Sequence, residues 1–382
     1  MRPSTPLSGF SARLRGEGPL LIALLVALLA YPLEHTILAA GRGLALFASA
    51  VLIAAILGVA LRVAHHAEAL AERYGEPYGT MILTISAVLV EVVILAIMLS
   101  HNPAPTLVRD TIYSALMLDI NGILGLAALL GGLRHGEQAY NVDSGNTYLT
   151  MILCAVGVSM IVPEFIPHAT WQAYSIFNIL IMLLLYGLFL RLQTGRYAAF
   201  FSYGHAHHVG QPAHGDPDAA GAAHDPVATR RSAALLVAGL VLIGALSEVM
   251  AKTVDAGLAG SGVPAIVPGL LVALISASPE ILTALRAALD DRMQPVVNIA
   301  LGASLSTVIL TVPVIEALAL FTGQPIEMAL TAPQTVMVLL TLLNTFEIES
   351  VATADGAEPA ERLMFAMAPV GLKMRLSLRS AA

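Results

Sequence analysis

The stretch Ser86-Ala-Val-Leu-Val-Glu91-Val-Val-Ile-Leu95 places a single carboxylate within an apolar run that is typical of a membrane helix. In the other half of the chain, Ile275-Ser-Ala-Ser-Pro-Glu280-Ile-Leu-Thr-Ala-Leu285 repeats this arrangement and adds a proline directly before the glutamate. A carboxylate near the bilayer midplane is unfavourable by a few kcal/mol unless a partner, a cavity or a proton compensates it. Two glutamates so placed predict a membrane protein with a functional site at mid-depth.

The composition indicates a membrane fold along most of the chain. Of 382 residues, 57% are hydrophobic and 12% are charged, whereas a soluble domain carries about 25% charged residues, so a soluble fold is excluded. A membrane helix needs about 20 mostly apolar residues. Ten stretches qualify, at residues 19–39, 43–61, 78–100, 110–132, 147–166, 172–191, 232–251, 263–284, 296–320 and 330–346. We predict an all-α polytopic membrane protein with about ten transmembrane helices in two inverted repeats.

A long polar segment divides the apolar helices into two halves. We expect a cytoplasmic N-terminal tail at 1–18, a first transmembrane bundle at 19–192, a cytoplasmic linker at 193–230, a second bundle at 231–346 and a polar tail at 347–382. In this arrangement the third helix, with Glu91, starts inside, and the eighth, with Glu280, starts outside. Related segments of opposite orientation are typical of inverted repeats in secondary transporters.

The basic residues predict the orientation, because the cytoplasmic loops of membrane proteins collect Lys and Arg. With a cytoplasmic N-terminus, the outside loops hold only Arg42, Arg109 and Lys252. The inside segments then hold Arg2, Arg13, Arg15, Arg62, Arg73, Arg134, Arg191, Arg196, Arg230, Arg231, Arg286 and Arg292. The apolar run from Leu20 to Ala30 is interpreted as the first helix rather than a cleaved signal, since the hydrophobic chain continues past it. We expect a multi-pass protein of the bacterial inner membrane.

Glu91 and Glu280 are the candidate ligands for a metal cation and for protons. Pro279 is expected to break its helix and to expose backbone carbonyls beside Glu280. A hard cation such as Ca²⁺ takes roughly 6 to 8 oxygen ligands. The supporting shell is expected from Ser86, Asn121, Ser276, Ser278, Asn298, Ser304 and Ser306. Because burial favours a protonated carboxyl and a nearby cation favours an ionised one, each glutamate would hold either a proton or the metal ion.

Other acidic residues lie in the apolar segments. Asp119 and Glu248 are candidates for a proton relay, and an interfacial pair with Lys252 is an equally good interpretation of Glu248. Glu164 and Glu316 are expected to be solvated, because they lie close to predicted helix ends. The alternative for Glu91 and Glu280 is a structural role, in which each is hydrogen-bonded to a neighbouring helix.

The linker contains a group of histidines that are candidates for a regulatory metal site: His205, His207, His208 and His214. Their spacing matches no fixed coordination geometry, so a solvated and disordered linker is the favoured interpretation.

Charge and cysteine content limit the partners. The net charge of -7 is small for this length and is divided between loops and apolar stretches, which argues against a nucleic-acid partner. Cys154 is the single cysteine, so neither a disulfide framework nor a thiolate metal site can form. The expected partners are inorganic cations, protons and the lipid bilayer, with no cofactor; homo-oligomerisation stays open.

Several motifs resemble a known transporter family across residues 70 to 345. They are Gly75-Glu-Pro-Tyr-Gly79, Val90-Glu91-Val92, Pro105-Thr-Leu-Val-Arg109-Asp-Thr-Ile-Tyr113, Leu129-Leu-Gly-Gly132, Gly269-Leu-Leu-Val-Ala-Leu274, Ser278-Pro-Glu280 and Asn298-Ile-Ala-Leu-Gly302 through Leu310-Thr-Val-Pro313. Together they resemble the cation/proton exchanger branch of the calcium/cation antiporter superfamily, most closely its bacterial calcium/sodium:proton antiporters.

The resemblance implies that Glu91 and Glu280 bind Ca²⁺ or Na⁺, with K⁺ as a further candidate, and exchange it for H⁺. Members of that family usually have an eleventh apolar helix. Here the chain from Glu347 onward is too polar to cross a bilayer. We therefore expect a truncation or a reading-frame change near residue 347.

Two other function classes stay open at this point. A cation channel or uniporter would conduct without moving protons. An intramembrane, Mg²⁺-dependent lipid-modifying enzyme would use the acidic pair Asp290-Asp291, but that pair also fits a solvated turn, and neither H-E-x-x-H nor G-x-S-x-G occurs.

Overall fold

The computed structural model describes residues 17–75, 78–101, 104–194, 226–264, 266–344, 347–352 and 373–377. The first half contains α2 (Gly18–Ala39), α3 (Arg42–Tyr74), α4 (Tyr78–His101), α5 (Leu107–Met117), η1 (Leu118–Leu124), α6 (Gly125–His135), α7 (Val142–Val156), η2 (Gly157–Ile161), η3 (Val162–Phe165), η4 (His168–Thr170) and α8 (Trp171–Thr194). The second half contains α11 (Pro226–Leu258), α12 (Ile266–Ser276), α13 (Ser278–Leu289), α14 (Met293–Ser306), η5 (Thr307–Thr311), α15 (Val312–Thr322) and α16 (Ala332–Asn344).

The predicted membrane helices are largely confirmed. Among the described residues, eight helices are long and apolar enough to span a membrane, and the bent pair α12–α13 makes nine. The stretch predicted at 330–346 forms the 13-residue helix α16. At about 1.5 Å per residue this helix covers about 20 Å, which is less than the hydrocarbon thickness of about 30 Å.

Two helices extend further than their apolar stretches predict. Helix α3 continues past Leu61 to Tyr74, because Val63, Ala67 and Leu70 recur at helical spacing and stay buried. Helix α11 begins at Pro226, inside the segment expected to be linker. The linker side of the molecule is therefore partly built from extended helix ends.

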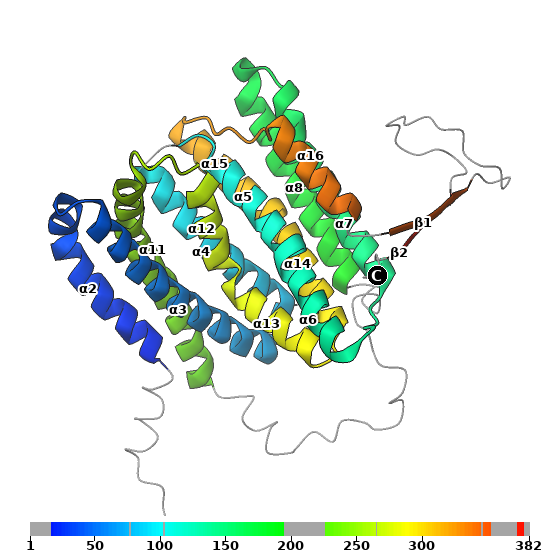
Figure 1. Cartoon of the computed structure of the whole chain (residues 1–382), viewed down its shortest axis with the longest axis horizontal. Coiled ribbons are helices and arrows are strands. Elements are labelled where there is room, and N and C mark those ends of the chain that lie inside the picture. Colours follow the sequence, from blue (N-terminus) through cyan, green and yellow to red (C-terminus); the bar gives the residue numbers. More distant parts are fainter. Residues whose placement is uncertain are drawn as a thin grey trace, which may run out of the picture.

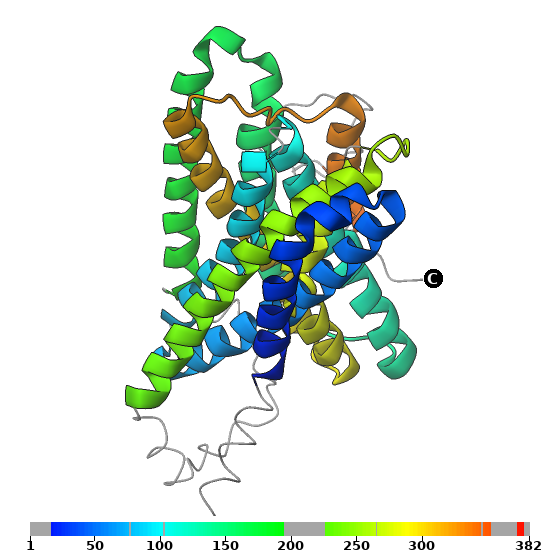
Figure 2. The ribbon, with the colours of Figure 1, turned by 90° about the vertical axis from the view of Figure 1, so that its left-hand side faces the viewer.

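Helices α2, α3 and α11 lie side by side at one end of the bundle (Figure 2). Of the described elements, α3 and α11 make the most extensive contact. At the linker side, Glu17 binds Arg62 of α3 at 3.1 Å and Arg231 of α11 at 3.3 Å. At the opposite side, Lys252 of α11 binds Glu34 of α2 at 2.9 Å. Ion pairs at both ends thus hold α2 against the α3–α11 pair.

The remaining spans form the other part of the bundle (Figure 1). Helix α12 packs against α5, α14 against α7 and η1, and α15 against α8.

Beyond the helices, strands β1 (Glu347–Ala352) and β2 (Lys373–Ser377) pair antiparallel, with Glu347 opposite Ser377. In Figure 1 this ribbon points away from the helices. No strands were predicted in the polar tail from the sequence.

The contact between α12 and α5 depends on Gly269. A Cβ atom at this position would lie 2.8 Å from the backbone nitrogen of Thr111 and 2.9 Å from the carbonyl carbon of Asp110. Backbone atoms cannot move aside as a flexible side chain can. Gly269→Ala is therefore expected to destabilise the protein by about 1–3 kcal/mol. The measurement is the thermal unfolding midpoint in detergent, with Gly125→Ala as control because nothing lies within 4 Å of a Cβ there. Equal midpoints for the two variants would contradict this packing.

Candidate functional site

Glu91 lies in the middle of the unbroken helix α4 and is 2% exposed. Its Oε2 accepts hydrogen bonds from Thr307 Oγ1 at 3.3 Å and Thr311 Oγ1 at 3.2 Å. Its Oε1 has no hydrogen-bond partner within the described part of the chain. One oxygen of the carboxylate is therefore held by η5, and the other is buried and unpaired.

Glu280 lies beside a break between two helices. Helix α12 ends at Ser276, α13 begins at Ser278, and the two axes differ by 57°. The predicted break at Pro279 is confirmed, since this proline lies at the start of α13. Glu280 falls in the first turn of α13, where the helix dipole favours negative charge. Its Oε2 also has no partner among the described residues.

Asp119 brings a third carboxyl group to the site. It is 2% exposed and accepts a hydrogen bond from Ser304 Oγ at 3.1 Å. It lies in η1, a π-helical segment, and such segments often occur at functional sites. Asp119 is close enough to interact electrostatically with both Glu91 and Glu280. When all three are ionised they repel one another, which favours binding of a cation or a proton between them.

These carboxyl groups line one cavity of about 420 Å³. Its wall comes from both halves of the chain: α3, α4, α5, η1, α7 and α8 from the first, and α12, α13, α14 and η5 from the second. The polar residues of the wall are Glu68, Thr84, Ser86, Glu91, Asp119, Gln193, Ser276, Glu280, Thr283, Asn298, Ser306 and Thr307, together with the hydroxyl-bearing Tyr148. Two halves that are far apart in sequence thus build one cavity, in which a group of polar side chains is set within a largely apolar wall.

Four of the predicted shell residues line this cavity: Ser86, Ser276, Asn298 and Ser306. The other three are not part of its wall. Asn121 donates instead to Thr341 Oγ1 at 3.1 Å, and Ser278 Oγ donates to the carbonyl of Ile275 at 2.8 Å. Ser304 is fully buried behind Asp119, to which it donates. Its contact with a ligand would be indirect, through that carboxylate.

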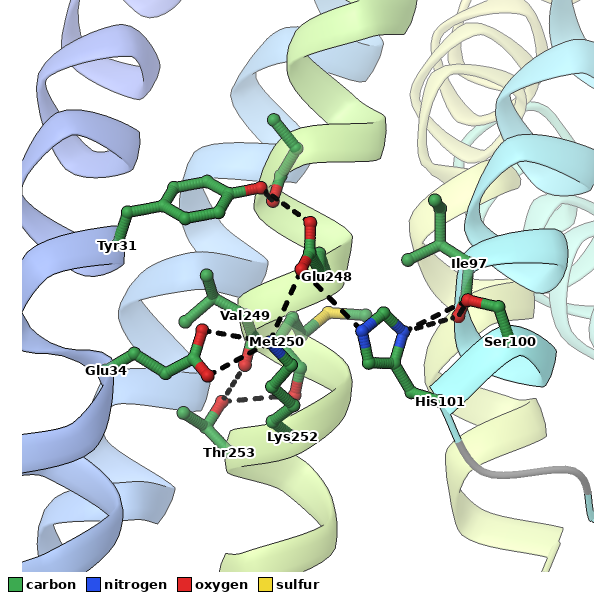
Figure 3. Close-up of polar contacts among 11 residues, drawn as sticks. Tyr31, Glu34, Ile97, Ser100, His101, Glu248, Val249, Met250, Lys252 and Thr253 are labelled. Atoms are coloured by element: carbon green, nitrogen blue, oxygen red, sulfur yellow. Dashed lines mark hydrogen bonds and ion pairs between the residues drawn. The ribbon is translucent and has the colours of Figure 1, made fainter.

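Glu248 lies in a separate polar cluster with Tyr31, Glu34, His101 and Lys252 (Figure 3). It accepts a hydrogen bond from the Tyr31 hydroxyl at 2.9 Å and from Lys252 Nζ at 3.3 Å, and His101 Nε2 lies 3.7 Å away. The pair with Lys252 is therefore present. Glu248 is not among the residues that line the cavity, so a relay through it stays a prediction.

The sequence interpretation missed Thr311 and Glu68, and it did not select Thr307 as a ligand-shell residue. Thr307 and Thr311 are four residues apart on η5, a spacing that places both on one helical face. That spacing was the available signal. Glu68 lies at the linker end of α3, beyond the stretch expected to be a membrane helix, so nothing in the apolar pattern pointed to it.

Glu164 and Glu316 were both expected to be solvated. Glu164 is exposed, which confirms the expectation for that residue. For Glu316 the expectation is wrong, since this side chain is 4% exposed. The reason is that α15 packs against α8 and places Glu316 at their contact.

The histidine candidates His205, His207, His208 and His214 lie outside the described residues. Within the described ranges, no group of three or more His, Cys, Asp or Glu side chains is arranged to hold a metal ion. Asp290 is the C-cap of α13, and Asp291 adopts the left-handed conformation with φ of 56° and accepts a hydrogen bond from Gln138. The acidic pair therefore forms a helix-terminating turn.

Comparison with known protein families shows which family this chain belongs to. The family model of the sodium/calcium exchanger proteins matches residues 44–195 and 231–362, which together make up most of the chain. The chain belongs to the sodium/calcium exchanger family. The second match continues past α16 into the segment that holds β1.

Named relatives of this exchanger-family chain are transporters. It is 34% identical over 292 residues to the sodium-potassium/proton antiporter ChaA of Escherichia coli (strain K12), covering 75% of this chain and 78% of that protein. It is 30% identical over 287 residues to the putative ionic transporter y4hA of Sinorhizobium fredii (strain NBRC 101917 / NGR234), covering 73% and 75%. The protein is thus a transporter, and the lipid-modifying enzyme considered from Asp290 and Asp291 is excluded.

Solved structures share the exchanger-family fold. The structure of native YfkE superimposes with a TM-score of 0.62 at 19% identity, covering 81% of this chain and 90% of that one. The H⁺/Ca²⁺ exchanger CAX superimposes with a TM-score of 0.57 at 13% identity, covering 86% and 81%. At these identities the likeness shows the fold, and the chain is a polytopic membrane protein of this architecture.

Proposed function

We propose that the protein is a secondary antiporter of the bacterial inner membrane that exchanges Ca²⁺ or Na⁺, with K⁺ as a further candidate, for H⁺. The observation that carries this proposal is that one cavity is lined by both Glu91 and Glu280, one from each half, and that each has a carboxylate oxygen without a partner among the described residues. Relatives named as sodium-potassium/proton and Ca²⁺/H⁺ antiporters support the same class of reaction.

Exchange follows from competition for the same oxygens. The carboxyl groups of Glu91, Glu280 and Asp119 are not arranged as a preformed metal site among the described residues, so a cation entering the cavity would have to draw them together, and hydroxyl and amide oxygens of the wall with water would complete its shell. When protons bind these carboxylates instead, the negative charge that holds the cation is lost. Cation and protons therefore occupy the site alternately, which couples their movements.

The cavity extends toward the linker side of the bundle. Glu68 and Thr283 both line it and are exposed. Beyond Glu91 on α4, toward the opposite side, Ile94 and Leu95 are fully buried, as is Ile112 of α5. With a cytoplasmic N-terminus, this arrangement corresponds to a conformation open toward the cytoplasm. Transport would require the two halves to move relative to each other. The apolar residues Ile94, Leu95 and Ile112 would then separate, and the opening beside Glu68 and Thr283 would close.

The test is cation-dependent proton movement by the purified protein in liposomes, with Ca²⁺, Na⁺ and K⁺ examined separately. An imposed cation gradient is expected to drive proton movement in the opposite direction, reported by a pH-sensitive dye inside the vesicles. Cation flux without proton movement, at clamped membrane potential, would identify a channel or uniporter instead. No flux of any of the three cations in a folded sample would reject the proposal.

A further inference from the structure

Another buried carboxyl group lies outside the cavity, at the contact between α15 and α8. Glu316 of α15 is 4% exposed and Asn178 of α8 is fully buried. Asn178 Nδ2 donates to Glu316 Oε1 at 2.9 Å. Glu316 Oε2 and Asn178 Oδ1 both lack a hydrogen-bond partner in the described part of the chain. Two unpaired acceptors in one buried pair require an explanation, because each is unfavourable on its own.

No basic group compensates a charge on Glu316. Among the described residues, no Lys, Arg or His side chain lies within ion-pair distance of it. The titratable groups of α8 are Tyr174, Tyr186 and Arg191; those of α4, which also packs on α15, are Tyr78, Glu91 and His101; η5 has none. Of these, Tyr174 interacts electrostatically with Glu316, and its hydroxyl already donates to the carbonyl of Val158. An ionised Glu316 would be an uncompensated buried charge.

One proton accounts for both unpaired atoms. A protonated carboxyl group carries an O–H donor next to its carbonyl acceptor. If Glu316 Oε2 carries the proton and donates to Asn178 Oδ1, it closes a ring of two hydrogen bonds with the existing bond from Nδ2 to Oε1. A metal ion fits less well, since two oxygens are far fewer than the roughly 6 to 8 that Ca²⁺ takes.

We infer that Glu316 and Asn178 form a proton-binding site, separate from the cavity, that holds one proton between Glu316 Oε2 and Asn178 Oδ1. The site ties α15 to α8, and α15 continues from η5, whose Thr307 and Thr311 hold Glu91. Loss of the proton would leave a charge and an unpaired acceptor at the α8–α15 contact. The proton site itself is independent of the proposed transport function.

The test is infrared spectroscopy of the full-length protein at neutral pH, which detects the C=O stretch of a protonated carboxyl group. Glu316→Gln keeps a ring of two amide hydrogen bonds with Asn178 and should fold. Its spectrum is expected to lack one protonated-carboxyl band that the unaltered protein shows. The matched control is Glu164→Gln, which removes an exposed carboxylate and should leave all such bands in place.

Asn178→Leu provides a second, independent readout. With its amide partner removed, the Glu316 band is expected to move to higher frequency, because its C=O no longer accepts a hydrogen bond. A Glu316→Gln spectrum that keeps every protonated-carboxyl band, or an Asn178→Leu spectrum with no shifted band, would overturn the inference. Liposome transport by the same variants is scored separately, so a failure of the antiport proposal would leave the infrared result interpretable.

Discussion

Replacing Glu280 or Glu91 by glutamine is expected to reduce cation-driven proton movement in everted membrane vesicles by up to about a hundredfold. Each substitution keeps the size of the side chain but removes its charge and its exchangeable proton. A hydrogen-bonded or ligating charge contributes up to about 3 kcal/mol, and every 1.4 kcal/mol or so corresponds to a factor of ten. Both glutamates face one cavity, so either loss should be sufficient.

The matched control for these variants is Glu164→Gln, which changes an exposed carboxylate at a helix end and should transport normally. Equal amounts of protein in the membrane and equal elution profiles in detergent show that the variants fold. Full activity in both Glu91→Gln and Glu280→Gln would contradict the proposed site and would favour the structural role that hydrogen bonds to neighbouring helices also allow.

Removing both threonines that hold Glu91 is expected to produce the second large effect. Thr307 and Thr311 each donate to Glu91 Oε2, and each bond to a charged group contributes about 1.5–3 kcal/mol. The double variant Thr307→Val, Thr311→Val keeps shape but leaves the carboxylate unsupported. We expect the cation concentration for half-maximal proton movement to increase about a hundredfold or more, with a smaller change in maximal rate.

A control on the same span separates this effect from general damage. Thr322 donates only to carbonyls of its own helix, at Leu318 and Ala319, and is exposed. Thr322→Val should therefore leave the half-saturating concentration unchanged. If the double variant binds cations as tightly as the unaltered protein, the hydrogen bonds from η5 do not support a functional carboxylate.

Much of the helical fold could be predicted because membrane spans are recognisable from local composition. The apolar run around Glu91 and the proline before Glu280 were sufficient to predict an intact helix and a broken one. Helix ends were less predictable, since α3 continues to Tyr74 through a polar segment with buried apolar residues on one face only. That periodicity is visible in the sequence but is not a membrane signal.

From the sequence, the site residues could be predicted only by their residue type and by their expected depth in the membrane. Glu91, Asp119 and Glu280 were selected because carboxylates within apolar helices need compensation. Which hydroxyls reach them depends on helix packing: Thr311 donates to Glu91, whereas Ser278 donates to the carbonyl of Ile275 in the preceding helix, α12. The burial of Glu316 likewise results from a contact between α15 and α8, which are far apart in the chain.

Competition between a metal cation and protons for Glu91 and Glu280 is tested most directly by proton release on binding. Ca²⁺, Na⁺ or K⁺ is added in turn to purified protein in weakly buffered detergent that contains a pH indicator. For at least one cation, we expect binding to release protons, and we expect the double variant Glu91→Gln, Glu280→Gln to release none. Tight cation binding without proton release, or release by the double variant equal to that of the unaltered protein, would contradict the account.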